Sequence, residues 1–292
     1  MGELDITEKL FADYEDVFAD IMNGFLFKGD PIIKPEDLAR NGVISQYKAE
    51  DSKIHEEERD VCKNWTKKGI RLAIYGLENQ TNVCNEMAAR VIGYDGASYR
   101  SQLLAKEKEQ QIVPVVTLVL YFGEKSWSGP RCLSDLVNVP EELKPYFNDY
   151  RLNIAEVALL EEEQLSWFHS DFYMVAEYFV KKRIYGKSYQ PSSQHIKHVD
   201  EFLKLMAVLT KDSNWTSLPE EIKERKGGVS MCDVLEYREE KGIEKGIEKG
   251  IKKGIELRDD QLNTKAEELK KAGKSAEEIL STLFPKLNYS KE

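Results

Sequence analysis

Residues 112–122 form an almost continuously apolar run, which limits what this chain can fold into more than any other segment. A strand with apolar side chains on both faces must be covered on both sides by other elements. The run therefore predicts a central strand in a sheet between layers of helices, an α/β fold. No apolar run in the sequence approaches the roughly 20 residues that a membrane-spanning helix needs.

Residues 70–81 predict a second strand, which follows a turn at residues 67–69 and a short strand around residues 58–63. Alternate residues of a strand point to the same face of its sheet. The shared face begins apolar and ends polar, and comprises Ile70, Leu72, Ile74, Gly76, Glu78 and Gln80. Glu78 and Gln80 should therefore emerge together at the end of the strand.

Two helices are predicted beside these strands from apolar residues that recur every three or four positions. The first covers residues 10–25 and carries Asp13, Asp16 and Asp20 on its polar stripe. The second covers residues 85–109, with expected core contacts from Met87, Val91, Ile92, Leu103 and Leu104.

With 292 residues, the chain is long enough for one large domain and an appendage. We expect a domain over residues 1–226, which includes a helical region at 151–215, and a helical tail over residues 227–292. In this tail, isoleucine and glycine each recur every fourth residue from Gly242 to Ile255. Each interior glycine costs a helix about 1 kcal/mol relative to alanine, so the tail predicts helix packing in a homo-oligomer or with a partner. A flexible charged extension is the alternative.

Composition excludes several classes of protein. The four cysteines contain no CxxC pair, and His195 and His198 are the two histidines that lie close together, so zinc-ligand spacing is absent. The cysteines are typical of small buried side chains in a reducing compartment. The N-terminus is acidic and lacks the layout of a signal peptide, which predicts a soluble cytoplasmic protein.

The net charge of −10 argues at first against a nucleic-acid partner. However, residues 1–39 hold ten acids and three basic residues, whereas residues 40–110 hold eleven acids and twelve basic residues. The acidity thus lies mainly in the N-terminal segment, and this weakens the objection.

Asp60 and Glu78 are the best candidates for chemistry. They are separated by 17 residues, and Gln80 follows Glu78 after one more residue. Two carboxylates on neighbouring strands could hold Mg²⁺, which prefers hard oxygen ligands. Spacing alone fits equally well a pair of solvent-facing carboxylates at strand ends. However, a charged residue on the inner face of an apolar strand is uncommon without a function or a partner.

The segment from Gly76 to Thr81, Gly-Leu-Glu-Asn-Gln-Thr, makes the sequence recognisable. With Met87, Arg90, Tyr94-Asp95 and Tyr99, it resembles the recombination-promoting nuclease / putative transposase family of the PD-(D/E)XK nuclease superfamily. Similar stretches lie at residues 18–23, 118–123 and 127–131, and the glycine-rich tail also resembles those of the family.

The resemblance implies a restriction-endonuclease-like αβββαβ core, with added helices, that cuts DNA with Mg²⁺ or, in its place, Mn²⁺. Asp60 matches the first acid of the motif and Glu78 the second. Gln80 stands where the superfamily usually has lysine, and Arg59 replaces the proline before the aspartate. The lysine matters because its charge stabilises the transition state.

The resemblance also suggests auxiliary residues. Arg90 and Tyr94 lie where some relatives place a glutamine–tyrosine pair, as candidate phosphate contacts. Asp20 best matches the helix carboxylate that completes such sites, with Asp16 as the alternative; a solvated acidic stripe explains both equally well. Lys63 is a weaker candidate for a DNA contact.

The leading hypothesis is therefore a metal-dependent DNA endonuclease, tied to recombination, mobile elements or defence. Asp60, Glu78 and Gln80 would form its catalytic group, with Asp60 and Glu78 as metal ligands. A catalytically silent module that keeps the fold and binds nucleic acid or protein is one alternative, because the motif lysine is missing. An RNA nuclease is the other.

Overall fold

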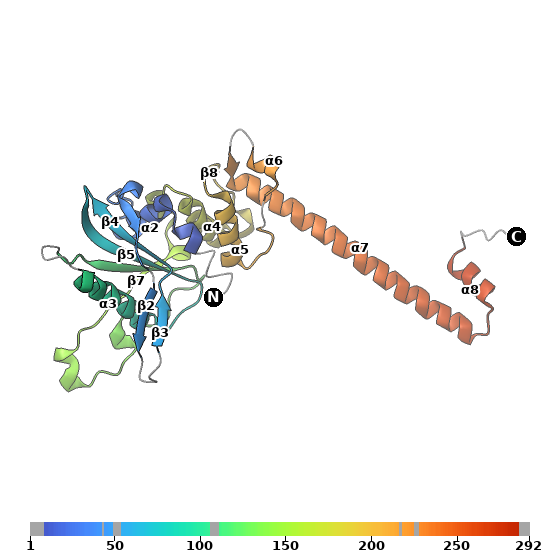
Figure 1. Ribbon diagram of the computed structural model, residues 1–292. Helices are drawn as coiled ribbons and strands as arrows, with labels where there is room; N and C mark the ends of the chain where they lie inside the picture. The colour runs from blue at the N-terminus through green and yellow to red at the C-terminus, as the bar shows by residue number, and fades with distance from the viewer. Residues whose placement is uncertain are drawn as a thin grey trace. The chain divides into compact units, whose positions relative to one another are not determined.

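A five-stranded mixed sheet lies at the centre of the chain, whose structure is a computed structural model (Figure 1). The chain divides into two compact units, residues 1–234 and 235–292, and the sheet belongs to the first. The structure describes residues 9–42, 44–48, 54–105, 111–215, 218–224 and 228–285, with the backbone alone at 44–48 and 54–58.

The strands of the sheet follow the order β1–β4–β5–β6–β7. Three of them, β1 (Leu38–Arg40), β4 (Val61–Lys67) and β5 (Ile70–Gln80), form an antiparallel meander. The other two, β6 (Val115–Tyr121) and β7 (Asn153–Glu156), run parallel to β5. Because β6 has a neighbour on each side and is buried from Thr117 to Tyr121, the predicted central strand is confirmed.

A tight turn joins β4 to β5. Lys67 pairs with Ile70, and the two residues between them, Lys68 and Gly69, have φ angles of 52° and 79°. Positive φ at both central residues defines the type I′ turn, whose twist matches that of the flanking strands. The predicted hairpin is therefore present, and its register places Val61 opposite Leu77.

Helices cover both faces of the sheet (Figure 1). One face carries Cys62, Gly76 and Glu78 and lies against α3 (Met87–Ala105), the crossover between β5 and β6. The opposite face carries Lys63, which is hydrogen-bonded to the residues that lead into α2 (Glu15–Phe27). This arrangement is a mixed α/β fold, as the sequence predicts.

Three of the expected core residues of α3 are exposed. Met87 and Val91 are buried, but Ile92, Leu103 and Leu104 are 36%, 58% and 84% exposed. Ile92 and Leu104 border an open groove beside the start of β5. The prediction that Ile92, Leu103 and Leu104 are core contacts is therefore wrong.

A second helical group packs beside α2 within the same unit. It contains α4 (Phe172–Tyr185) and α5 (Val199–Thr210), and the ring of Phe25 lies 6.0 Å from that of Phe172. The helical region predicted at residues 151–215 is wrong at its start, because residues 153–156 pair with β6 as β7.

The remaining elements are short, apart from the helices of the tail. They are η1 (Pro35–Asp37), β2 (Ile44–Lys48), β3 (Ile54–Glu58), η2 (Leu133–Asp135), η3 (Glu141–Tyr146), η4 (Val157–Leu159), η5 (Glu162–Trp167), η6 (Gly186–Ser188), β8 (His195–Ile196), α6 (Glu220–Lys223), β9 (Val229–Ser230), α7 (Met231–Lys271) and α8 (Ala276–Leu283).

The predicted tail is helical. The 41-residue α7 includes every glycine of the repeat, and Ser275 and Glu278 form a capping box at the start of α8. The boundary between the two units follows Val234, a few residues beyond the predicted joint at residues 227–228, of which Gly227 lies outside the described residues. Of the cysteines, Cys62 is buried and the other three are half-buried. None of the described helices has the length and apolar character of a membrane span.

Candidate functional site

Asp60 and Glu78 are brought together by the β4–β5 hairpin. Asp60 lies in a bend immediately before β4 rather than within the predicted strand. Its Oδ2 accepts a hydrogen bond of 2.7 Å from the backbone N–H of Asn79, the residue after Glu78. Because Val61 pairs with Leu77, Asp60 stands beside Glu78 on the α3 face of the sheet.

Glu78 is fully buried. Arg90 of α3 donates from Nη2 to its Oε2 over 3.1 Å, whereas its Oε1 is buried without a hydrogen-bond partner. Burial is the main cause that raises the pKa of Glu78 to about 8, and the negative charge of Asp60 is the second cause. The positive charge of Arg90 lowers this pKa in part. A buried acceptor without a donor is costly, so this oxygen is available to a cation or a water molecule.

Cations from two other segments lie against the two acids. Lys9 places its Nζ 3.8 Å from Oδ1 of Asp60. Arg90 also donates to the hydroxyl of Tyr94 over 3.0 Å, and the charge of Glu78 raises the pKa of this guanidinium although burial opposes it. Arg90 and Tyr94 thus lie at the acid pair, as their positions suggested. Lys9 was missed, because nothing in its spacing links it to residue 60.

Gln80 occupies the last position of β5, paired with Tyr121 of β6. It is half-buried, and it shares the α3 face of the strand with Glu78, two residues earlier. Gln80 places a neutral amide where the motif usually has a lysine.

A buried hydrogen-bond network is centred on Arg59, the residue before Asp60. Arg59 is 2% exposed, and its Nη2 donates to Oδ1 of Asp95 over 2.8 Å. Asp95 also accepts hydrogen bonds from the hydroxyls of Thr117 and Tyr150. The guanidinium packs against Gly76, where a Cβ atom would come within 2.7 Å of Arg59. Arg59, the residue before Asp60, is therefore connected through this network to α3, β6 and the segment before β7.

The comparison with known families identifies the family of this chain. A family model described as putative transposase, YhgA-like, matches residues 54–211, more than half of the chain. The chain belongs to this YhgA-like family. The family is PD-(D/E)XK-like, so the resemblance seen in the sequence is confirmed. No curated protein and no solved structure matches the chain.

Asp20 of this YhgA-like chain is hydrogen-bonded to the segment before α4. Its carboxylate accepts hydrogen bonds from the backbone N–H groups of His169 and Ser170 and from the Ser170 hydroxyl, at 2.7–2.9 Å. Burial nevertheless raises its pKa. Asp16 is paired instead with Lys197 and His198.

Two carboxylates therefore constitute the acidic part of the candidate site. Across the residues that the structure describes, no group of three His, Cys, Asp or Glu side chains is placed to hold a metal ion. Asp60 and Glu78 are the two carboxylates that the hairpin brings together.

Lys63, the weaker candidate for a DNA contact, has a structural role in this YhgA-like protein. Lys63 is fully buried and ion-paired with Asp13 at 2.9 Å and with Glu15 at 3.1 Å, which leaves its charge no surface for DNA.

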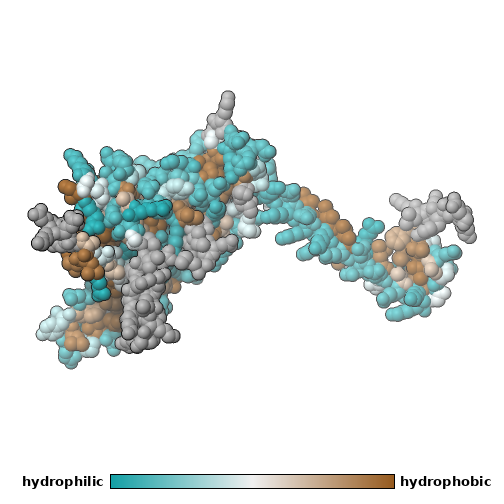
Figure 2. All heavy atoms as spheres, viewed as in Figure 1, coloured by the Kyte–Doolittle hydropathy of each residue, from teal (hydrophilic) through white to brown (hydrophobic). Residues whose placement is uncertain are grey.

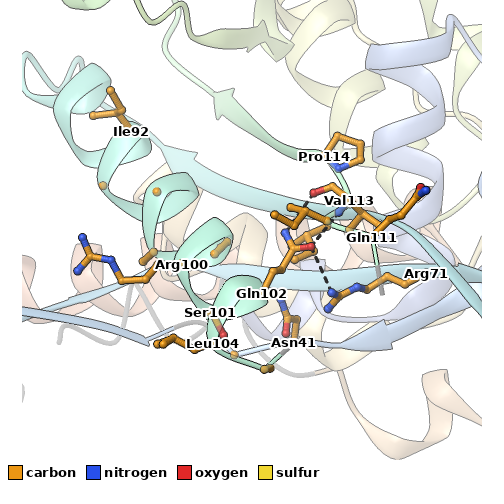
Figure 3. A pocket seen from close by; sticks show the side chains of 18 of the residues that line it. Asn41, Arg71, Ile92, Arg100, Ser101, Gln102, Leu104, Gln111, Val113 and Pro114 are labelled. Atoms are coloured by element: carbon orange, nitrogen blue, oxygen red, sulfur yellow. Dashed lines mark hydrogen bonds between the residues drawn. The ribbon is translucent and has the colours of Figure 1, made fainter. Parts of the chain in front are cut away.

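A groove of about 2010 Å³ runs along α3 and the start of β5 (Figure 3). Three arginines line it, Arg71, Arg90 and Arg100, and Arg90 also touches Glu78. At one end the side chain of Gln102 is hydrogen-bonded both to Arg71 and to the backbone of Val113 (Figure 3). With Glu86 as the acidic residue of its lining, the groove carries a surplus of positive charge, and Arg90 joins it to the acid pair.

Proposed function

We propose that this YhgA-like protein is a metal-dependent DNA endonuclease. The order of its elements supports a restriction-endonuclease-like core: α2, the meander β1–β4–β5, the crossover α3, and the parallel strand β6 follow the αβββαβ sequence. The family name, a transposase, supports DNA as the substrate.

The buried Oε1 of Glu78 is the observation that carries the proposal. It lacks a protein donor, and the carboxylate of Asp60 lies beside it. Two such carboxylates fit Mg²⁺, which commonly takes one or two carboxylates and completes its shell with water and substrate phosphate. When bound, Mg²⁺ or Mn²⁺ would neutralise the charge that builds on the phosphate and activate a water molecule.

The surrounding side chains take supporting roles in this proposal. Asp60 and Glu78 would hold the ion, and the amide of Gln80 would orient the attacking water or contact the phosphate. Arg90 would exchange its contact with Glu78 for one with a phosphate oxygen when DNA enters, and would keep its hydrogen bond to Tyr94. Lys9, near Asp60, adds positive charge where Gln80 adds none. Fixed charges of this kind stabilise a developing anion.

A cleavage assay tests the proposal. Wild-type protein is incubated with supercoiled, linear and single-stranded DNA in Mg²⁺ or Mn²⁺ and compared with Asp60→Asn and Gln80→Lys. We expect Asp60→Asn to abolish cleavage and Gln80→Lys to retain or increase it. Glu124→Ala, which removes an exposed carboxylate just after β6, is the matched control and should cut like the wild type. If no DNA form is cut, or if Asp60→Asn cuts as well as the wild type, the proposal is wrong.

A catalytically silent binding module is the second candidate, and one observation favours it. Glu78 is already engaged by Arg90, and Gln80 supplies no charge. Calorimetric titration with Mn²⁺ separates the two functions, because a silent module should show no binding that is lost in Glu78→Gln. Matched DNA and RNA substrates then identify the nucleic acid that an active enzyme cuts.

A further inference from the structure

The groove along α3 differs in charge from the chain as a whole. Its described lining holds three arginines and one acidic residue, whereas the net charge of the chain is −10. A cleft lined by one sign of charge raises the local concentration of ligands of the opposite sign. The groove should therefore attract an anionic ligand, which the acidic remainder of the chain repels.

The arginines mark a path that leads away from the acid pair. Arg90, near the start of α3, is hydrogen-bonded to Glu78, and Arg100 follows ten residues later, about 15 Å further along the helix axis. Arg71 belongs to β5, which also borders the groove, and is hydrogen-bonded to Gln102 (Figure 3). Among the residues that the structure describes, Arg71 and Arg100 have no carboxylate as an ion-pair partner. Their charges are therefore available to a ligand with several negative charges.

The lining of the groove also contains large apolar side chains that are exposed. Four of them are between 36% and 84% exposed, namely Ile70, Ile92, Leu104 and Ile112. Hydrophobic and hydrophilic residues lie side by side at the surface around α3 in Figure 2. Exposed apolar side chains with polar groups around them are typical of an interaction surface. The occupant of the groove should therefore offer apolar faces as well as negative charge.

We propose that this groove binds an unpaired strand of DNA and leads it to Asp60 and Glu78. The phosphates of the strand contact the arginines, and its unpaired bases lie with their faces on the apolar side chains. A duplex fits the groove less well, because its bases are stacked inside and mainly phosphates and sugars would meet the isoleucines. The position of the strand at the acid pair rests on the proposed function, in which the scissile phosphate lies beside Asp60.

The direction of the groove determines the class of substrate. A strand that lies in it contacts both Arg100 and Arg90, and Arg90 is the residue that touches the acid pair. The DNA must therefore be unpaired over several nucleotides beside the point of cleavage. DNA with a single-stranded overhang or gap meets this requirement, whereas a continuous duplex does not.

Fluorescence anisotropy of labelled oligonucleotides in EDTA measures binding without cleavage. The full-length protein is titrated into a single DNA strand of about 20 nucleotides, longer than a usual single-strand site, into its blunt duplex and into RNA of the same sequence. We expect the single DNA strand to bind at least about tenfold more tightly than the duplex. A duplex that binds as tightly as the single strand, or RNA that binds more tightly than DNA, would overturn the proposal.

Gly96 of α3 allows the charge of the groove to be changed in either direction. It lines the groove, and an added Cβ atom would meet nothing within 4 Å. Glutamate and lysine both favour a helix more than glycine does, so either variant should fold. We expect Gly96→Glu to weaken binding of the single strand by about fivefold and Gly96→Lys to strengthen it by about fivefold, the effect of one unit charge near a phosphate in water. Equal affinities of the two variants would show that the strand lies elsewhere.

The salt dependence of binding tests the phosphate contacts. The logarithm of the affinity for a single strand falls with the logarithm of the salt concentration, with a slope of about 0.7 for each phosphate that the protein neutralises. Arg100→Gln should therefore reduce the slope by about 0.7. Lys204→Gln, which removes an exposed charge of α5 outside the described lining, is the control and should leave the slope unchanged. An unchanged slope in Arg100→Gln would refute this contact.

These binding measurements are independent of cleavage. A protein that binds the single strand as expected but cuts no DNA in Mg²⁺ or Mn²⁺ would retain the strand-binding groove and refute the endonuclease. A protein that cuts DNA, but binds the single strand equally well in both Gly96 variants, would refute the groove and retain the endonuclease.

Discussion

Replacing Gly76 with alanine should destabilise this protein. Gly76 lies in the centre of β5, opposite Cys62, and its Cα faces the guanidinium of Arg59. A Cβ atom there would lie 2.7 Å from Cδ and Nη1 of Arg59 and 2.8 Å from Cζ. The arginine is buried and ion-paired with Asp95, so it cannot swing into solvent.

The size of the effect follows from these contacts. Ordinary contacts between carbon atoms are about 3.5–4.0 Å, so Arg59 must retreat by about 1 Å. The same movement stretches its 2.8 Å bond to Asp95 beyond hydrogen-bonding distance. Overpacking costs about 1–3 kcal/mol, and separating a buried ion pair adds to it, so we expect a loss of about 2–5 kcal/mol. For a unit of this size the midpoint of thermal unfolding should fall by about 5–15 °C.

Urea unfolding followed by tryptophan fluorescence measures this loss. Gly96→Ala is the matched control, because Gly96 lies on the exposed side of α3 and an added Cβ meets nothing within 4 Å. That substitution should leave stability unchanged or raise it by up to about 1 kcal/mol, since alanine favours a helix. If Gly76→Ala unfolds at the same urea concentration as Gly96→Ala, the close packing of Arg59 against β5 is refuted.

Three further predictions concern stability. The pKa of Glu78 rises from its ordinary 4.5 to about 8 on folding, so the folded state binds the proton more tightly than the unfolded state does. Without divalent metal, the free energy of unfolding should therefore fall as pH rises between these two values. Urea titrations at several pH values measure this slope, which Glu78→Gln should lack. Asp20→Ala leaves the half-buried donors of Ser170 without this acceptor and should lower the free energy of unfolding by about 1–3 kcal/mol, while cleavage by the folded protein stays unchanged. Lost cleavage would give Asp20 a catalytic role. Ser275→Ala removes the cap that Glu278 shares and should destabilise α8 by about 1 kcal/mol, seen as faster amide exchange there; unchanged exchange would contradict the capping box.

The parts of the fold that the sequence predicted are those with a local or periodic signal. The β4–β5 hairpin follows from a two-residue turn between alternating strands, and β6 follows from its uninterrupted apolar run. Strand β7 was missed, because its four residues are too few to distinguish a strand from the helical pattern after it.

The candidate site divides in the same way. The pairing of Asp60 with Glu78 could be predicted, since one hairpin carries both. The contact of Asp20 with Ser170 could not, because it joins residues 150 positions apart, and an amphipathic stripe identifies a polar face without its partner. Lys9 and the Arg59–Asp95 pair were missed for the same reason: long-range ionic contacts leave no periodicity in the sequence.

The tight turn at Lys68-Gly69 has a consequence for the order in which the protein folds. Hairpins with a two-residue loop form within microseconds, because closing a short loop costs little entropy. Asp60 and Glu78 are joined by this local hairpin, whereas Arg90 reaches Glu78 only once the α3 crossover has docked and β6 has paired with β5. We therefore expect the two negative charges to meet before Arg90 arrives, so that their mutual repulsion opposes the early hairpin. A folding rate that rises as pH falls below the ordinary pKa of the carboxyl groups would be the kinetic sign of this order.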